Sequence, residues 1–203
     1  MTPGLDGLAR RLEEALARAP AEPADEERRA AVAMILRAQE EDGPAARTAP
    51  DVLLMRRREH PEDRWSGQIS LPGGHKDPGD ADLLATALRE AREEVGVDLA
   101  RSARLVGRLP RVQARARGRI VPMGITPFVF EVTRAVAPHP GIEAREVFWF
   151  PLARAGTGEL DQEYRFTRDD GLVHTLPSWR HEERIVWGLT HRMLAELLRL
   201  LSD

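Results

Sequence analysis

Apolar residues recur along this chain at regular spacings, and each spacing predicts a kind of element. A three-to-four-residue spacing predicts amphipathic helices over residues 8–19, 82–95 and 183–200. The apolar stripe of the second helix consists of Leu84, Leu88, Ala91 and Val95. The third helix is expected to turn five residues toward the core, namely Ile185, Leu189, Met193, Leu197 and Leu200.

Stretches rich in β-branched and aromatic residues predict strands between these helices. The strands are expected over residues 30–36, 52–57, 68–71, 105–109, 120–132 and 147–150. Two more, 164–167 and 172–176, are typical of a hairpin around Asp169-Asp170-Gly171. Residues 43–50 and 136–142 are expected to be loops, and Trp179 is expected in another loop after Pro177-Ser178. Strands mixed with a few helices favour an α/β fold.

Composition then narrows the class of protein. The chain has 203 residues, 42% of them hydrophobic, which suits one domain with its own core. We expect an N-terminal helical extension over residues 1–27 and a single domain over residues 28–203. A net charge of −3 argues against a nucleic-acid partner, and the lack of an 18-residue apolar run argues against a membrane partner. Zero cysteines and no apolar leader favour a cytoplasmic location.

The segment Arg-Glu-Ala-Arg-Glu-Glu-Val-Gly-Val over residues 89–97 carries the clearest chemical signal. On a helix Glu90 lies three residues from Glu93 and four from Glu94, so the three carboxylates emerge together. Like charges at this spacing repel, which suggests a cation between them. Oxygen-only ligands favour a hard cation such as Mg²⁺ or Mn²⁺. A solvated charged helix is the alternative, because exposed glutamates are common.

The surroundings of these glutamates fit a longer motif. Paired glycines in Leu71-Pro72-Gly73-Gly74 allow a tight backbone path before the helix, and Gly96 is a natural residue to end it. The pattern Gly74-x5-Asp80-x8-Arg89-Glu90-Ala91-x-Glu93-Glu94-x-Gly96-Val97 resembles the Nudix box of the Nudix hydrolases, G-x5-E-x7-R-E-U-x-E-E-x-G-U with U aliphatic. Asp80 replaces the first Glu, which is not among the family's usual metal ligands, and the next span is one residue longer.

The flanking segments resemble the coenzyme A diphosphatase branch of that family. This resemblance rests on Leu53-Leu54-Met55-Arg56-Arg57, Gly67-Gln68, Thr86-Ala87-Leu88 and Val186-Trp187-Gly188-Leu189-Thr190. The chain departs from the branch at Leu71, where Phe is usual, and at His75, where Lys is usual. Trp65-Ser66 also stands where the branch usually has a His-containing segment. These departures bear on the substrate and leave the class of reaction unchanged.

The resemblance implies a Nudix-type α/β/α sandwich with a mixed sheet. It also implies a diphosphatase in which Glu90, Glu93 and Glu94 bind Mg²⁺ or Mn²⁺, with the Gly73 carbonyl as a further ligand. Arg89 is expected to hold one of these carboxylates in place and to be part of the catalytic set.

Four residues are candidates for substrate binding: Arg57, Gln68, Arg111 and Trp179. Arg111 belongs to an arginine cluster that either binds phosphate or lies in a solvated loop, comprising Arg108, Arg111, Arg115, Arg117 and Arg119. Trp179 is the tryptophan expected to stack on an adenine. Glu143 and Glu146 are both candidates for the general base or for a further metal ligand.

The leading hypothesis is metal-dependent hydrolysis of coenzyme A or acyl-coenzyme A to 3′,5′-ADP and (acyl-)4′-phosphopantetheine. An ADP-ribose or nucleotide-sugar diphosphatase is the alternative within the class. A non-catalytic Nudix-fold nucleotide-binding regulator is the alternative from another class, and it would be expected to have lost the glutamates. The partner expected is a small nucleoside diphosphate derivative. The oligomeric state is open, with a homodimer among the alternatives.

Overall fold

The computed structural model describes residues 5, 7–19, 29–38, 50–61, 65–116, 119–167 and 171–202. Its helices are α1 (Leu8–Arg18), α2 (Leu83–Val95), α3 (Leu99–Ser102), α4 (Leu152–Gly156) and α5 (Gly188–Ser202). Its first strands are β1 (Arg29–Arg37), β2 (Asp51–Arg57), β3 (Ile69–Ser70), β4 (Gly73–His75), β5 (Ala103–Arg108) and β6 (Val112–Ala116). The remaining strands are β7 (Arg119–Val132), β8 (Ala144–Pro151), β9 (Asp161–Thr167), β10 (Val173–His181) and β11 (Arg184–Trp187).

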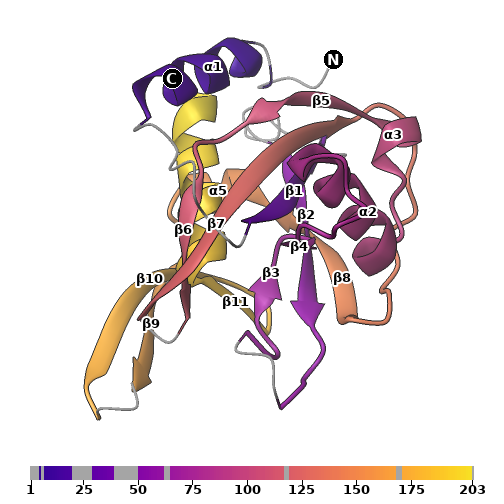
Figure 1. The fold of residues 1–203 in the computed structure, drawn as a ribbon. Helices are drawn as coiled ribbons and strands as arrows, with labels where there is room; N and C mark the ends of the chain where they lie inside the picture. Colours follow the sequence, from indigo (N-terminus) through magenta and orange to yellow (C-terminus); the bar gives the residue numbers. More distant parts are fainter. Residues whose placement is uncertain are drawn as a thin grey trace.

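The larger sheet is mixed, and this confirms the predicted α/β class. Its central strand β1 runs parallel to β7 and antiparallel to β2 and β4. β3 and β8 pair with β2, while β5 and β6 pair with β7. A second, antiparallel sheet of β9, β10 and β11 extends from the body of the molecule (Figure 1).

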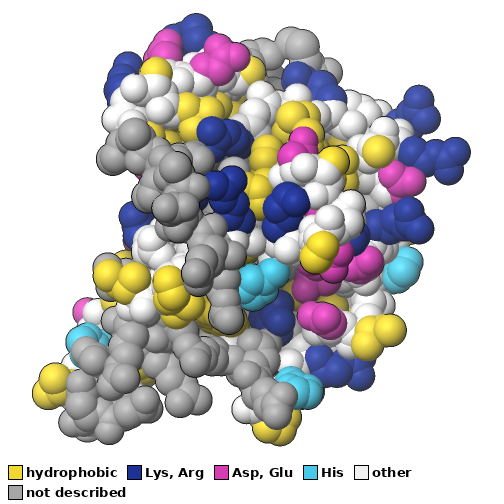
Figure 2. Space-filling view, in the orientation of Figure 1, with side chains coloured by type: hydrophobic (Ala, Val, Ile, Leu, Met, Phe, Trp, Pro, Cys, Tyr) yellow, Lys and Arg dark blue, Asp and Glu magenta, His cyan; other side chains and the backbone are white. Residues whose placement is uncertain are grey.

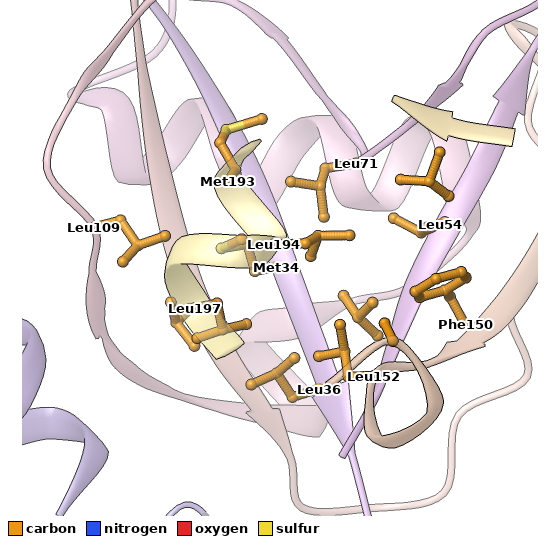
Figure 3. Close-up of a cluster of buried hydrophobic side chains, with 14 of the residues drawn as sticks. Met34, Leu36, Leu54, Leu71, Leu109, Phe150, Leu152, Met193, Leu194 and Leu197 are labelled. Atoms are coloured by element: carbon orange, nitrogen blue, oxygen red, sulfur yellow. The ribbon is translucent and has the colours of Figure 1, made fainter. Parts of the chain in front are cut away.

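The apolar run in β1 is continuous because both faces of the strand are covered. Side chains alternate along a strand, so Ala31, Ala33 and Ile35 pack in one cluster with α2. Met34 and Leu36 point to the opposite face and pack in a second cluster with α5 (Figure 3). Helices on both faces of the sheet give the sandwich its layers, and they fix α2 beside β4, where the glycines lie.

The N-terminal helix is part of the same core. Leu8 and Leu12 on α1 are fully buried and belong to the cluster that contains α5 residues. A Cβ on Gly107 of β5 would come within 3.0 Å of Leu12, so the helix lies directly on that strand. The helix predicted over 8–19 is thus confirmed, and it packs on the main body. The proposed boundary at residue 28 stays a prediction.

Two predicted features near the C-terminus are wrong. The helix expected from residue 183 begins only at Gly188, because Arg184–Trp187 pairs with β10 as β11. A tight turn at Glu182, with φ of 55°, lets the chain reverse, and the β-branched Ile185-Val186 pair then suits a strand. Trp179 lies inside β10 rather than in a loop, because Pro177 and Ser178 continue that strand.

Two short strands, β4 and β6, were not predicted as strands. β6 lies in the segment between two predicted strands that contains the arginine cluster, and it pairs antiparallel with β7. Its sequence Val-Gln-Ala-Arg-Ala alternates between apolar and polar residues, but alanine favours strands only weakly, as does glycine in β4. Most of the predicted loop over residues 43–50 lies outside the described residues.

Candidate active site

The carboxylates of the box are positioned by the ends and the buried face of α2. Asp82 caps the helix by accepting a hydrogen bond from the Ala85 N–H at 2.8 Å. Gly96 ends it in the left-handed region, at φ of 69°. Ala87 and Ala91 are fully buried against the sheet. The glutamate cluster, which we define as Glu90, Glu93 and Glu94, comes from the part of the helix beside β4.

Glu94 is the most buried member of the glutamate cluster. Its side chain is only 3% exposed, and it accepts a hydrogen bond from the Gly73 N–H at 2.7 Å. Burial raises the pKa of Glu94 to about 8; the Gly73 N–H opposes this rise, while the charge of Glu90 adds to it. The nearest cation is Arg57 of β2, whose guanidinium lies 3.6 Å from the carboxylate. The site therefore holds a buried carboxylate whose charge is poorly compensated.

Two adjacent glycines bring the backbone up to these carboxylates. Gly73 has φ of 158°, and a Cβ there would lie 2.6 Å from the Cα of Val32. A Cβ on Gly74 would overlap the carboxylate of Glu90. Gly73 therefore needs glycine, because β4 packs directly on the backbone of β1, whereas a side chain on Gly74 would displace the carboxylate of Glu90. Burial also raises the pKa of Glu90, an effect that Arg89 opposes.

Arg89 links the cluster to the loop before α2. Its guanidinium lies 2.9 Å from Glu90 and 2.9 Å from Glu93. The same group donates to both oxygens of Asp80, at 3.1 and 3.0 Å, and to the His75 carbonyl at 3.1 Å. Asp80 in turn accepts hydrogen bonds from Thr86 and from the Asp77 N–H, each at 2.9 Å. Asp80 thus holds Arg89, which in turn holds two glutamates.

In this arrangement the cluster is drawn toward Arg89. Among the described residues, no three carboxylate or imidazole side chains converge as they would around a bound metal ion. Glu90 and Glu93 both face the guanidinium, whereas Glu94 faces Gly73. The donor set still fits a hard divalent cation, because it consists of oxygens and the buried Glu90 and Glu94 have raised pKa values.

Replacing Asp80 by asparagine is expected to lower the free energy of unfolding by about 1–2 kcal/mol, because a charge-assisted contact to Arg89 is lost in a partly exposed setting. Arg89 lowers the pKa of Asp80 well below its usual range. The stabilisation is therefore present above about pH 4 and is lost as the pH falls below it.

Urea unfolding of wild type and Asp80→Asn at pH 7 and pH 3 measures this effect. Glu159→Gln is the matched control, because Glu159 is paired with Arg154 on the exposed surface. An Asp80→Asn variant as stable as wild type at pH 7 would contradict the proposed anchoring of Arg89.

A cavity of about 1310 Å³ opens beside the cluster and has two kinds of wall. One is polar and includes Arg57, Gln68, Glu90, Glu94 and Glu143. The other, which we call the C-terminal wall, is mostly apolar and comprises Phe166, His174, Leu176, Trp187, Leu189 and Met193. In the view of Figure 2, acidic side chains gather near the lower end of α2 as drawn in Figure 1. The cavity thus joins a charged site to an apolar one.

The structure separates the predicted substrate-binding residues into two pairs. Arg57 and Gln68 line the cavity as expected for binding residues. Arg111 is absent from the lining, as far as the described residues show, and Arg108 is too. The side chains of Arg115, Arg117 and Arg119 lie outside the described residues.

The expectation that Trp179 stacks on an adenine is contradicted by its burial. Trp179 is only 4% exposed and stacks on Phe150, with ring centroids 5.8 Å apart. Its indole N–H donates to Asp161 at 2.9 Å, so its polar atom is already paired. The tryptophans that do line the cavity are Trp65 and Trp187.

The two candidate bases lie in different surroundings. Glu143 lines the cavity, is 68% exposed and lies 3.7 Å from Arg57. Glu146 pairs instead with Arg56 at 2.9 Å and with Arg184 at 3.2 Å. Only Glu143 of the two is on the cavity surface within the described part of the chain.

The sequence analysis did not predict that the residues of the C-terminal wall line a cavity. The predicted hairpin could have indicated it, because alternate residues of a strand share one face of the sheet. Phe166 and His174 are register partners, as are Tyr164 and Leu176, so the four side chains gather on that face. Leu189 and Met193 of α5, which join them, were expected to face the core, and their place on a cavity wall was not predicted.

Comparison with known proteins identifies the family. The model of the NUDIX domain matches residues 27–170. A human protein named mitochondrial coenzyme A diphosphatase NUDT8 is 33% identical over 160 residues, covering 78% of this chain and 66% of that protein. The chain thus spans slightly less than two thirds of that relative. A Yersinia pestis (strain Pestoides F) protein named uncharacterized Nudix hydrolase NudL is 31% identical, covering 77% of this chain and 75% of its own.

Solved structures give the same fold at lower identity. A MutT/nudix family protein from Enterococcus faecalis superposes with a TM-score of 0.53 at 17% identity, covering 98% of this chain and 73% of its own. A NUDIX hydrolase from Alicyclobacillus acidocaldarius superposes with a TM-score of 0.51 at 18% identity, covering 89% of this chain and 94% of its own.

None of the described helices is long and apolar enough to cross a bilayer.

Proposed function

The chain belongs to the Nudix hydrolase family, and on this premise we propose that it hydrolyses diphosphate bonds and that its substrate is coenzyme A or an acyl-coenzyme A. The observation that carries the proposal is the glutamate cluster beside Gly73-Gly74 at the edge of a large cavity. The choice of coenzyme A is supported by the human relative's name and by the branch-like segments around Gln68 and Trp187.

The residues proposed to hold a divalent cation, Mg²⁺ or Mn²⁺, are Glu90, Glu93, Glu94 and the Gly73 carbonyl. When bound, such an ion neutralises charge on the phosphoryl oxygens and lowers the pKa of a water molecule. The chain's own part is to keep Glu94 buried and to hold Glu90 and Glu93 through Arg89. Arg89 would release them to the ion while staying bound to Asp80.

The reaction proposed is attack of water on one phosphorus of the diphosphate. One P–O bond to the bridging oxygen breaks, and 3′,5′-ADP and 4′-phosphopantetheine leave. We assign Glu143 as the base that accepts the proton of the water, because it is exposed on the cavity wall. Arg57, between Glu94 and Glu143, would bind a phosphoryl oxygen, and Gln68 would bind a neighbouring polar group.

The 3′-phosphate of coenzyme A needs a cation, and neither Arg108 nor Arg111 of the predicted cluster lines the cavity, as far as the described residues show. Arg192 of α5 is a better candidate, because it is exposed, lines the cavity and has no ion-pair partner within the described ranges. Loss of a charge-assisted contact typically reduces kcat/KM by roughly ten- to a hundredfold. We therefore expect 3′-dephospho-coenzyme A to be cleaved at least about 10-fold less efficiently than coenzyme A.

The test is kcat/KM for coenzyme A, 3′-dephospho-coenzyme A, ADP-ribose and a nucleotide sugar under one set of conditions. Arg192→Gln should remove the preference for the 3′-phosphate, while Arg101→Gln on α3, which is exposed and lies off the cavity lining, should keep it. If ADP-ribose or the nucleotide sugar is the best substrate, the coenzyme A assignment is wrong and the diphosphatase class remains.

The non-catalytic regulator is the alternative from another class. It is disfavoured because all three glutamates of the cluster are present and pair with Arg89 or lie beside it, with Glu90 and Glu94 lining the cavity. Absence of hydrolysis across the whole panel, together with tight nucleotide binding, would favour it.

A further inference from the structure

Most of the C-terminal wall comes from a part of the chain that the family match does not include. That match ends at residue 170, whereas five of the six wall residues lie beyond it, from His174 to Met193. β11 packs beside β3, so this wall faces the polar wall across the same cavity. In Figure 1 the sheet of β9, β10 and β11 and the helix α2 lie on opposite sides of β3. A region outside the shared domain is therefore placed to select the substrate.

The aromatic rings of this region are stacked on one another. Phe166 stacks on His174 with centroids 5.5 Å apart, and Trp187 stacks on Tyr164 at 4.3 Å. Phe166 also lies 5.7 Å from Trp187 at a tilt of 40°. These contacts occupy one face of each ring, so a ligand in the cavity has at most the opposite face or the edge of a ring to contact. The rest of the wall is aliphatic or thioether surface from Leu176, Leu189 and Met193.

Two polar atoms at the cavity have no partner. His174 Nε2 and Ser70 Oγ are buried and make no hydrogen bond within the described part of the protein, and both residues line the cavity. Buried polar atoms are normally paired, by water or by a ligand when no protein group is near. A ligand that fits here is therefore mostly apolar and carries a few hydrogen-bonding groups. A sugar, with a hydroxyl on most carbons, fits such a wall poorly.

We propose that the strand residues of the C-terminal wall, above all His174 and Leu176, bind the aliphatic, amide-bearing pantetheine arm of the substrate and an acyl chain carried on its thiol, while Arg192 of α5 faces the nucleotide end. This inference rests on the proposed function, and it adds the position at which the non-nucleotide end of coenzyme A binds. The arm has two amides for the unpartnered polar atoms and otherwise apolar carbons for the aliphatic surface. Because the cavity of about 1310 Å³ exceeds the roughly 300–1,000 Å³ of typical ligand pockets, room is left for an acyl extension.

The kinetic test compares coenzyme A, octanoyl-coenzyme A and ADP-ribose on wild type and variants. Each buried methylene is worth about fourfold, so wild type should favour octanoyl-coenzyme A over coenzyme A by at least about 10-fold in kcat/KM. Leu176→Asp should abolish that preference and leave residual ADP-ribose cleavage unchanged. Leu172→Asp is the matched control, because Leu172 is 60% exposed on the same hairpin and does not line the cavity.

A second variant tests the hydrogen-bonding part of the wall. His174→Phe keeps the ring beside Phe166 but removes Nε2. It should raise KM for coenzyme A by about two- to tenfold with little change in kcat, and it should not affect ADP-ribose. A fall in kcat for both substrates would point to a structural role and count against the assignment.

Failure of this inference can be told apart from failure of the proposed function. If wild type cleaves coenzyme A but neither the acyl chain nor Leu176→Asp changes kcat/KM, the wall assignment is overturned and the proposed function stands. If wild type does not cleave coenzyme A, the proposed function fails. The assignment of the C-terminal wall is then tested independently, by measuring the binding of S-octanoyl-pantetheine by calorimetry. Binding at least about 10-fold tighter to wild type than to Leu176→Asp supports the wall, and equal binding overturns it.

Discussion

Replacing Glu94 by glutamine is expected to lower kcat by at least about 100-fold while the fold stays intact. Glu94 is 3% exposed and is held by the Gly73 N–H at 2.7 Å. A glutamine can accept the same hydrogen bond, so the local structure is preserved. What the variant loses is a negative charge at the proposed metal site, and Glu93→Gln should have a similar effect for the same reason.

The stability of Glu94→Gln separates a functional carboxylate from a structural one. Burial of a poorly compensated charge opposes folding, so removing that charge should leave the free energy of unfolding at pH 8 equal or higher. Arg92→Gln is the control, because Arg92 is exposed on the same helix. Near wild-type turnover of both Glu93→Gln and Glu94→Gln with saturating Mg²⁺ would remove the proposed site.

Removal of divalent cations is expected to abolish hydrolysis, and their return is expected to stabilise the fold. A ligand present at 100 times its Kd adds about 2.7 kcal/mol to the free energy of unfolding. For a chain of this size that corresponds to a rise in Tm of roughly 5–10 °C. The physical reason is that burial disfavours the charged forms of Glu90 and Glu94, and a bound cation would stabilise those charges.

Thermal unfolding and turnover in EDTA, Mg²⁺ and Mn²⁺ measure both parts of this expectation. The variant Glu93→Gln/Glu94→Gln should show a much smaller metal-dependent rise in Tm than wild type. Full turnover in EDTA would contradict the assignment of the glutamate cluster as a metal site.

The helix that carries the glutamate cluster was predicted well from the sequence, because it depends on local signals. The helix over 82–95 and its end at Gly96 are both encoded by residues within one short stretch. The glycines before it were also recognised, although the packing of Gly73 on Val32 was not foreseen. Helical spacing was enough to bring Glu90, Glu93 and Arg89 together.

The predicted substrate-binding residues were less successful, because their positions depend on contacts between distant segments of the chain. Trp179 follows a proline and a serine that usually mark a loop, yet its pairing with Asp161 keeps it in a strand. The role of Asp80 was likewise underestimated, because its bidentate contact with Arg89 spans nine residues and a turn. Arg111 was predicted to bind substrate only because of its charge, and charge alone does not determine the direction in which a side chain points.

The most direct test of the proposed function is product identification after incubation of the wild-type chain with coenzyme A and Mg²⁺. Mass spectrometry should find 3′,5′-ADP and 4′-phosphopantetheine in equal amounts, with neither formed in EDTA. Release of inorganic phosphate with accumulation of 3′-dephospho-coenzyme A would instead show cleavage of the monoester. That result, or intact coenzyme A in a sample that cleaves ADP-ribose, would contradict the proposed coenzyme A diphosphatase.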